Sequence, residues 1–343
     1  MRLSQKMYCH KSFIDTIAKK RKDNKAYMIA FKALLVLGDV YVDMSKKELK
    51  ELLDPKKSDN IYKALNKKAS DRLHCKENWA ANFNPEDIAD EVFFITPNGI
   101  ENHKQIREDY GCLIVAEDSD IFYLERMCRE NGFILIPAKA EKILTDNKVE
   151  SVFQKNWGDA FKKIKVMPIN AAIISDNFIF GDKYDSRKGY SLFNLLKILV
   201  PPSLKTSFHL TIFVCNDRGT LNQDRAQKII EEIKELNLCP DLKVTIVAHT
   251  EKSLSHDRKI LTNYHYITSG CGFNVVSENG PAEMAEGDIS CVFKSIEKSN
   301  TRITIKHKYD YSQALYKDIL ENRLNNNKNC FLVGDNINRL LKD

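Results

Sequence analysis

The sequence has no cysteines close enough together to suggest a shared zinc ion or a disulfide framework. Its nine cysteines occur singly, without a C-x-x-C pair and with none within four residues of another. Scattered cysteines are typical of reduced thiols that pack as small apolar residues. This spacing argues against a zinc site of the C-x-x-C type and against a disulfide-stapled secreted scaffold.

The sequence also lacks a long apolar run. No uncharged stretch approaches the roughly 18 residues needed to cross a bilayer. Residues 1–7 contain no apolar region like that of a secretory signal. Internal repeats and low-complexity tracts are absent as well. We therefore expect a cytoplasmic protein without a transmembrane segment.

The composition is that of an ordinary soluble globular protein. Apolar residues make up 43% and charged residues 29% of the 343 residues, and the formal net charge is +6. A prior of roughly 150 residues per domain gives two domains. The pI near 8.6 is compatible with phosphate-bearing partners, although dedicated nucleic-acid-binding domains usually have a pI above about 9.

The first half of the chain alternates helical patterns with short strand-like runs. Ser45 and Glu48 have the spacing of a capping box at the start of one helix. The expected helices span residues 13–21, 27–37, 46–53 and 121–130, and the expected strands span residues 92–96, 112–116 and 133–136. Strand, helix and strand in this order predict a parallel α/β sheet.

The second half has the same α/β character. Its expected strands span residues 171–174, 177–180, 210–214, 243–247, 264–268 and 301–305, and its expected helices span residues 190–199 and 223–236. We predict two α/β domains, residues 1–146 and 166–343, joined by a polar linker at 147–165. The second domain is expected to be a mixed sheet flanked by helices, with a C-terminal helical extension.

One stretch of the second half has the residue types of a phosphate site. His256 is followed by Arg258, then by Asn263 and by a turn containing Gly270 and Gly272. A nucleophile and a fixed cation must both reach one phosphoryl group, and this spacing can bring them together. The motif follows an expected strand, and open α/β sheets bind ligands at the carboxyl ends of strands.

Over about residues 169–295 this motif and the order of elements resemble the phospholipase D-like domain. The form found at the C-terminus of MIT-domain proteins of the membrane-remodelling machinery is the most similar. Catalytic members carry H-x-K-x4-D-x6-G-S-x-N. The resemblance implies that His256 is the nucleophile, Arg258 the phosphate-binding cation and Asn263 the residue at the acid's position, with no cofactor. The predicted phosphate-binding residues are Arg258, Lys259, Gly270, Gly272 and Asn274.

The motif departs from the catalytic pattern at several positions. Asn263 cannot carry the charge of an aspartate, Cys271 replaces the serine, and Phe273 stands in the asparagine's place. Catalysis in the family also needs two facing copies of the motif, so activity from this single copy would require a homodimer. The alternative is a purely structural cluster in which Asp257 and Arg258 form a pair.

An acidic run in the first half resembles a metal site. Glu117, Asp118 and Asp120 follow a strand-like segment, and residues 1–145 resemble, in part, a PIN-like nuclease domain. That resemblance implies Mg²⁺ or Mn²⁺ held by these carboxylates, with Glu48 or Glu51 as a further ligand. His10 stands where the family has an aspartate. A solvated loop and helix start would give the same acidic composition.

Together these features predict a protein that recognises phosphodiesters. We expect a nucleic-acid-binding protein, or a nuclease or phosphodiesterase, that serves as an effector or accessory subunit in bacterial defence. The alternative is a non-catalytic module that binds an acidic phospholipid surface or a protein partner and acts as a scaffold. A homodimer or larger assembly is expected in either case.

Overall fold

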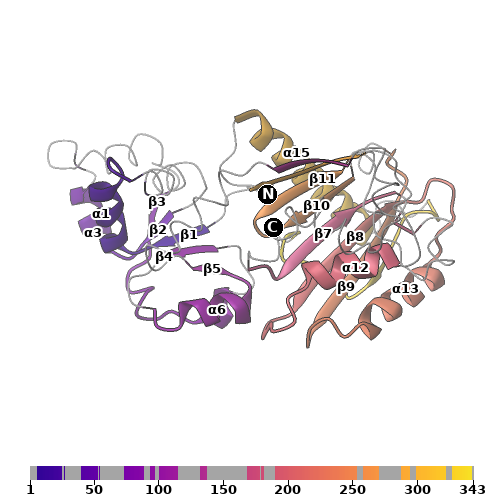
Figure 1. Cartoon of the computed structure of the whole chain (residues 1–343), viewed down its shortest axis with the longest axis horizontal. Coiled ribbons are helices and arrows are strands. Elements are labelled where there is room, and N and C mark those ends of the chain that lie inside the picture. The colour runs from indigo at the N-terminus through magenta and orange to yellow at the C-terminus, as the bar shows by residue number, and fades with distance from the viewer. Residues whose placement is uncertain are drawn as a thin grey trace, which may run out of the picture. The chain divides into compact units, whose positions relative to one another are not determined.

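The computed structural model divides the chain into two compact units, an N-terminal unit of residues 2–130 with 293–302 and a C-terminal unit of residues 131–292 with 303–343 (Figure 1). The structure describes residues 6–24, 27, 40–52, 54, 73–88, 93–96, 100–114, 132–136, 168–177, 179–180, 190–252, 258–269, 287–293, 299–321 and 327–341. No helix in these ranges is long and apolar enough to cross a membrane.

The described strands of the N-terminal unit form one parallel sheet in the order β3-β2-β1-β4-β5. They are β1 (Lys6–Cys9), β2 (Val40–Val42), β3 (Leu73–Cys75), β4 (Phe93–Thr96) and β5 (Leu113–Ile114). The chain starts in the centre, winds outward to β3 and crosses back to β4, which is a doubly wound arrangement. The predicted parallel α/β sheet is confirmed.

The described helices of this unit are α1 (Lys11–Lys20), α3 (Lys46–Leu52), α5 (Pro85–Ile88) and α6 (His103–Tyr110). The capping box predicted for α3 is confirmed. Ser45 N donates to Glu48 Oε2 at 2.9 Å, and Glu48 N donates to Ser45 Oγ at 3.3 Å. The hydrogen bonds from Ser45 lower the pKa of the Glu48 carboxyl. Most of the helices expected at 27–37 and 121–130 lies outside the described residues.

Aromatic side chains cover one face of the N-terminal sheet. Tyr8, Tyr41 and His74 stand in register across β1, β2 and β3. Their rings stack at centroid distances of 5.1 Å and 4.9 Å. Trp79 packs edge-on against Tyr8 at 5.4 Å, and Lys76 Nζ lies 4.7 Å from the centre of the same ring. We interpret this row as part of the hydrophobic core.

The C-terminal unit contains a mixed sheet in the order β13-β9-β8-β7-β10-β11-β12-β6. Its described strands are β6 (Gly132–Ile136), β7 (Ala171–Ser175), β8 (Phe208–Cys215), β9 (Leu242–His249), β10 (Arg258–Thr262), β11 (His265–Ser269), β12 (Gly287–Phe293) and β13 (Phe331–Gly334). Strands β7, β8 and β9 are parallel, whereas β10 and β11 form an antiparallel hairpin beside β7. Nearly all of β8 is buried, as expected for a parallel strand covered on both faces.

The described helices of this unit are α12 (Tyr190–Leu199), α13 (Gln223–Glu235) and, from residue 303 onward, α15 (Ser299–Leu320). Helices α12 and α13 confirm the predictions and lie on the face of the sheet toward the viewer in Figure 1. Asn222 caps the amino end of helix α13, because its side chain accepts from Arg225 N at 2.8 Å. It buries an apolar stripe that packs against β9 and β13.

Three segments differ from the sequence-based expectation. The strand predicted at 301–305 is wrong, because these residues belong to α15. The strand predicted at 177–180 is also wrong, because its described residues form turns. The segment 133–136, expected in the first domain, is a strand as predicted, but it pairs with β12 in the C-terminal sheet. Strand-like composition identifies a strand without identifying its partner.

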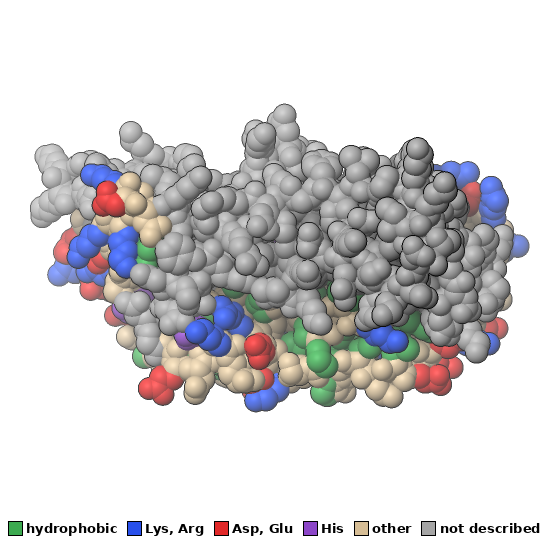
Figure 2. Space-filling model, viewed as in Figure 1, with side chains coloured by type: hydrophobic (Ala, Val, Ile, Leu, Met, Phe, Trp, Pro, Cys, Tyr) green, Lys and Arg blue, Asp and Glu red, His purple; other side chains and the backbone are tan. Residues whose placement is uncertain are grey.

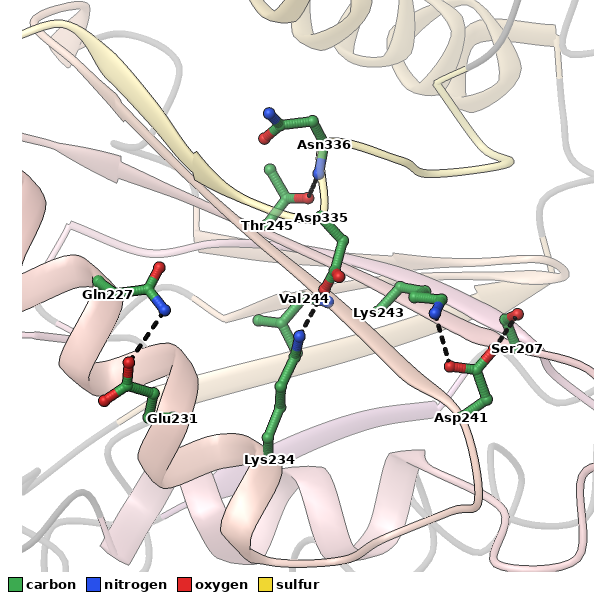
Figure 3. Close-up of polar contacts among 10 residues, drawn as sticks. All are labelled: Ser207, Gln227, Glu231, Lys234, Asp241, Lys243, Val244, Thr245, Asp335 and Asn336. Carbon is green, nitrogen blue, oxygen red and sulfur yellow. Dashed lines mark hydrogen bonds and ion pairs between the residues drawn. The ribbon is translucent and has the colours of Figure 1, made fainter.

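The C-terminal end of the described chain is held against β8 and β9. Asp335 Oδ2 accepts from Val244 N at 2.7 Å and lies 2.9 Å from Lys234 Nζ of α13 (Figure 3). The next residue, Asn336, donates its backbone N–H to Thr245 Oγ1 at 2.9 Å. Arg339, further along, donates its backbone N–H to His209 Nδ1 at 3.1 Å. These contacts make the segment after β13 an integral part of the C-terminal unit.

Candidate functional site

The carboxyl ends of β7, β8 and β9 meet at one edge of the C-terminal sheet because these strands are parallel. Open α/β sheets bind their ligands at this kind of edge. Strand β10 runs antiparallel to β7, with Lys259 opposite Ser175. Arg258, the first residue of β10, therefore lies beside the carboxyl end of β7.

The β8–β9 half of this edge is filled by a structural hydrogen-bond network. Asn216, only 1% exposed, donates through Nδ2 to the carbonyl oxygens of Leu221 and Asn329, at 2.8 and 3.1 Å. Its Oδ1 accepts from Leu221 N at 2.9 Å. Asn327 donates to Thr250 Oγ1 at 3.3 Å from the same loop. The half of the edge formed by β7 and β10 is therefore the better candidate for ligand binding.

Arg258 forms an ion pair with a fully buried carboxylate at this half of the edge. Arg258 Nε lies 3.7 Å from Asp176 Oδ1, and the Asp176 side chain is completely buried. This separation permits electrostatic attraction but is too long for a hydrogen bond. A buried carboxylate requires a compensating charge. Asp176 therefore helps to fix the guanidinium at the edge. The alternative partner, Asp257, lies outside the described residues.

Arg258 and Lys259 point to opposite faces of the sheet, because successive side chains alternate along a strand. The Lys259 side chain is fully buried. Ser175 shares its face by direct pairing, and Phe213 continues the same row on β8. His249 lies on this face near the end of β9, with its ring centroid 6.3 Å from that of Phe213. The structure thus separates Lys259 from the site around Arg258.

Asn263 lies at the other end of the hairpin. Five residues at about 3.3 Å each place it roughly 16 Å along the chain from Arg258. Its Oδ1 accepts from the backbone N–H groups of Asn170 and Ala171 at 2.9 and 3.0 Å. Its Nδ2 donates to Asn170 Oδ1 at 2.9 Å. The structure therefore does not bring Asn263 to the predicted phosphate site and uses it to hold the amino end of β7.

The hairpin brings Arg258 and Ser269, its first and last residues, to one edge of the sheet. Ser269, the last residue of β11, pairs with Arg258, so the chain leaves β11 beside the point at which it enters β10. The remaining predicted residues lie outside the described ranges: His256, Gly270, Gly272 and Asn274 of the phosphate site, and Glu117, Asp118 and Asp120 of the metal site. Their predicted roles stay predictions.

No protein-family model and no curated protein matches this chain. Its function is therefore inferred from the residues at this edge and from the resemblances of its motifs. Neither resemblance is tested by these comparisons.

Within the described ranges, no group of three His, Cys, Asp or Glu side chains is arranged to hold a metal ion. Glu48, which we considered as a ligand beside the acidic run, is engaged with Ser45 at the start of α3. His10, at the position of the family's aspartate, caps α1 by accepting from Ser12 N at 3.3 Å. The Glu48 carboxylate and the Nδ1 atom of His10 are therefore both engaged at the start of a helix.

Three residues at the carboxyl edge were not singled out from the sequence. Ser175, Asp176 and His249 each lie at or just after the end of a buried parallel strand. The signal that could have identified them was a polar residue directly after an apolar strand, at the edge where ligands bind. The motif around His256 indicated only the end of β9, whereas the edge is formed by the carboxyl ends of β7, β8 and β9.

His249 is expected to make the stability of the C-terminal unit dependent on pH. Burial, with a further contribution from the Lys259 ammonium, lowers the pKa of His249 from 6.5 to about 4. As the pH falls from 6.5 toward 4, the unfolded chain binds a proton that the folded chain does not. The stability present above pH 6.5 is therefore lost progressively, by up to about 3 kcal/mol near pH 4.

Hydrogen exchange of β8 and β9 between pH 7 and pH 4.5 would measure this loss once intrinsic exchange rates are corrected. His249→Gln should remove most of the additional destabilisation, whatever its effect on stability at pH 7. His74→Gln, in the N-terminal unit, serves as the control and should leave the pH dependence in place. An identical pH dependence in wild type and His249→Gln would rule out this role for His249.

Proposed function

We propose that the chain recognises phosphodiesters of nucleic acid through Arg258 at the carboxyl edge of the C-terminal sheet. The observation that carries this proposal is the pairing of β10 with β7, which puts Arg258 at a ligand-binding edge beside buried Asp176. A guanidinium remains charged and can bind two phosphate oxygens at once. The pairing of Arg258 with Ser269 supports a site that also includes the chain on either side of the hairpin.

Recognition is favoured over turnover by the position of Asn263. The resemblance puts Asn263 in the place of the family's acid, yet its amide is bound to Asn170 and Ala171 at the far end of the hairpin. The acid's contribution to catalysis is therefore not supplied by this residue. Arg258 still provides the fixed cation that phosphate binding requires.

The charge distribution fits recognition at a local site. On the face shown in Figure 2, basic and acidic side chains of the described residues are interspersed rather than separated into large patches. The net charge of +6 is modest for 343 residues. Long-range attraction to nucleic acid should therefore be weak, and a specific contact such as that of Arg258 would contribute a large share of the affinity.

Fluorescence anisotropy with labelled single-stranded RNA, single-stranded DNA and duplex DNA would test the proposal. Arg258→Gln should weaken binding about tenfold or more, because a hydrogen bond to a charged group contributes about 1.5–3 kcal/mol. Arg258→Lys should have an intermediate effect, since it keeps the charge but loses the planar fork. Lys243→Gln makes the same change in charge at the amino end of β9 and should leave binding unchanged.

Asp176→Asn separates loss of binding from loss of structure. It removes the buried ion pair but retains the cation, so binding should persist. Equal affinity in wild type and Arg258→Gln would overturn the proposal. Arg258-dependent binding to anionic lipid vesicles, with no affinity for any of the nucleic acids, would instead support the phospholipid-binding alternative.

A further inference from the structure

Strand β13 forms one end of the C-terminal sheet. Among the described strands it pairs only with β9, so one of its two edges has no strand of this part of the chain beside it. Leu332 and Val333 are partly exposed, and Gly334 is exposed. The strand has the sequence FLVG, without the charged side chains or proline that commonly protect an edge. Such an edge is a template for pairing with another strand.

The register of β13 shows which backbone groups face this open edge. Asp335 N, one residue beyond the strand, donates to Val244 O of β9 at 2.9 Å. Because backbone groups alternate in direction along an antiparallel strand, those of Val333 also face β9. The N–H and C=O groups of Leu332 and Gly334 therefore face away from β9.

These outward-facing groups are complementary to a second copy of themselves. An antiparallel pair of β13 strands with a two-fold axis at Val333 puts Leu332 of each copy opposite Gly334 of the other. Each such pair exchanges both of its N–H···O=C hydrogen bonds. The two-fold axis is perpendicular to the sheet, so the same helices lie on the same face in both copies.

Helix α13 is positioned to add to this junction. It packs against both β9 and β13, so its axis lies over the space between two neighbouring strands. In a continuous sheet the α13 helices of the two copies lie two strand spacings apart, or about 10 Å. Helices that pack against each other are roughly 8–10 Å apart. Pairing of the strands therefore also brings the two helices to packing distance.

The side of α13 over β13 is exposed and carries both signs of charge. Lys234 Nζ lies 2.9 Å from Asp335 Oδ2, directly after β13. Gln227 and Glu231 share this side of the helix with Lys234, because the three follow the spacing i, i+4, i+7. Gln227 Nε2 donates to Glu231 Oε1 at 3.1 Å (Figure 3). With one acidic and one basic side chain on this side, two copies of it can meet without net repulsion.

We propose that β13 is a dimerisation edge at which a second copy of the chain continues the C-terminal sheet, with α13 packed against its counterpart. The occupant is a copy of this chain because the hydrogen-bond pattern, the helix spacing and the charges are all self-complementary. The junction contains only four residues of each strand. A weak dimer is therefore expected, with a dissociation constant of about 1–100 µM. The proposal does not depend on phosphate binding by Arg258, which lies on another strand of the sheet.

Sedimentation equilibrium of the full chain, over a concentration series that spans this range, would test the proposal. Residue-resolved hydrogen exchange at the two ends of the series identifies the surface. The amides of Leu332 and Gly334 should exchange more slowly in the dimer, whereas the amide of Val333, bonded to β9 in either state, should exchange equally.

Leu332→Pro and Glu231→Lys test the two parts of the junction separately. Leu332→Pro removes an N–H that faces away from β9, where proline is tolerated, and should weaken the dimer about tenfold because each copy loses one hydrogen bond. Glu231→Lys makes this side of α13 uniformly basic and should also weaken the dimer about tenfold. Glu77→Lys makes the same change in charge in the N-terminal unit and should leave the dissociation constant unchanged.

A chain that stays monomeric at every concentration would overturn the proposal. A dimer with the same dissociation constant in wild type, Leu332→Pro and Glu231→Lys would also overturn it, because that dimer uses another surface. The same holds for a dimer in which the Leu332 amide gains no protection. Should Leu332→Pro not fold, the exposed substitution Glu231→Lys and the exchange of the wild-type amides still decide the question.

Discussion

Asn263→Ala is expected to destabilise the C-terminal unit by at least about 3 kcal/mol, since it leaves three buried polar atoms without a partner and each costs about 1–3 kcal/mol. The substitution removes the acceptor from the backbone N–H groups of Asn170 and Ala171, and the donor from Asn170 Oδ1. Asn263 is 1% exposed and Asn170 is fully buried, so water cannot easily replace these bonds. Urea unfolding monitored by hydrogen exchange of β7 and β10 would measure the loss.

Asn222→Ala provides a scale for this effect within the same unit. It removes one side-chain hydrogen bond at the exposed start of α13 and should cost about 1 kcal/mol. If Asn263→Ala costs no more than Asn222→Ala, then the buried amide network is not important for stability.

Asn263→Asp tests whether Asn263 is structural or stands in the place of a catalytic acid, because it restores the carboxylate found in the catalytic family. The carboxylate can still accept from Asn170 N and Ala171 N, but it faces Asn170 Oδ1 with a second acceptor and brings a negative charge into a buried turn. We expect a loss of stability and no gain in nucleic-acid binding or cleavage. A variant as stable as wild type that cleaves nucleic acid would instead restore Asn263 to the predicted site.

The parts of the fold that could be predicted from the sequence are those in which local chemistry and tertiary structure agree. Helix α3 was predicted because Ser45 and Glu48 satisfy each other's backbone groups within one turn. Strands β7, β8 and β9 were predicted because a strand buried on both faces is a nearly continuous apolar run. Each of these signals lies within a few residues of the chain.

The parts that could not be predicted depend on distant partners. Strand β10 begins with Arg258 and Lys259, and two charged residues are atypical of a strand at the centre of a sheet. Asp176 compensates the charge of Arg258, whereas Lys259 points to the opposite face of the sheet and pairs with Ser175 in the β7–β10 ladder. The segment 301–305 shows the converse, since its β-branched residues favour a strand locally and yet form part of α15.

The same limit applies to the predicted site. Spacing along the chain put Arg258, Lys259 and Asn263 in one group, whereas the hairpin distributes them over two faces and two ends of the sheet. A motif in sequence corresponds to a site only if strand alternation and register bring its side chains together. For Arg258, the register supports a position at the carboxyl edge of the sheet.

The attachment of β13 leads to an equally large expected effect for Gly334→Ala. Gly334 has φ +113°, a conformation that side chains disfavour, and an added Cβ would lie 2.1 Å from the carbonyl oxygen of Val244 and 2.9 Å from Ile230 Cδ1. Backbone strain and overpacking each cost about 1–3 kcal/mol, so we expect a loss of roughly 2–6 kcal/mol. Urea unfolding with hydrogen exchange of β9 would measure it.

Gly219→Ala is the matched control, because Gly219 also has a positive φ, of +66°, but has more room. Its added Cβ would lie 3.0 Å from Asn329 Oδ1, a side-chain atom that can move, and the expected cost is about 1 kcal/mol. In Gly334→Ala, by contrast, the backbone of β9 or β13 must shift, which would disturb the bonds from Val244 and Thr245 to the segment after β13. Protection of β9 amides should therefore fall more in Gly334→Ala than in Gly219→Ala. Equal protection in the two variants would mean that β13 can leave β9 without cost and that the C-terminal segment does not stabilise the edge of the sheet.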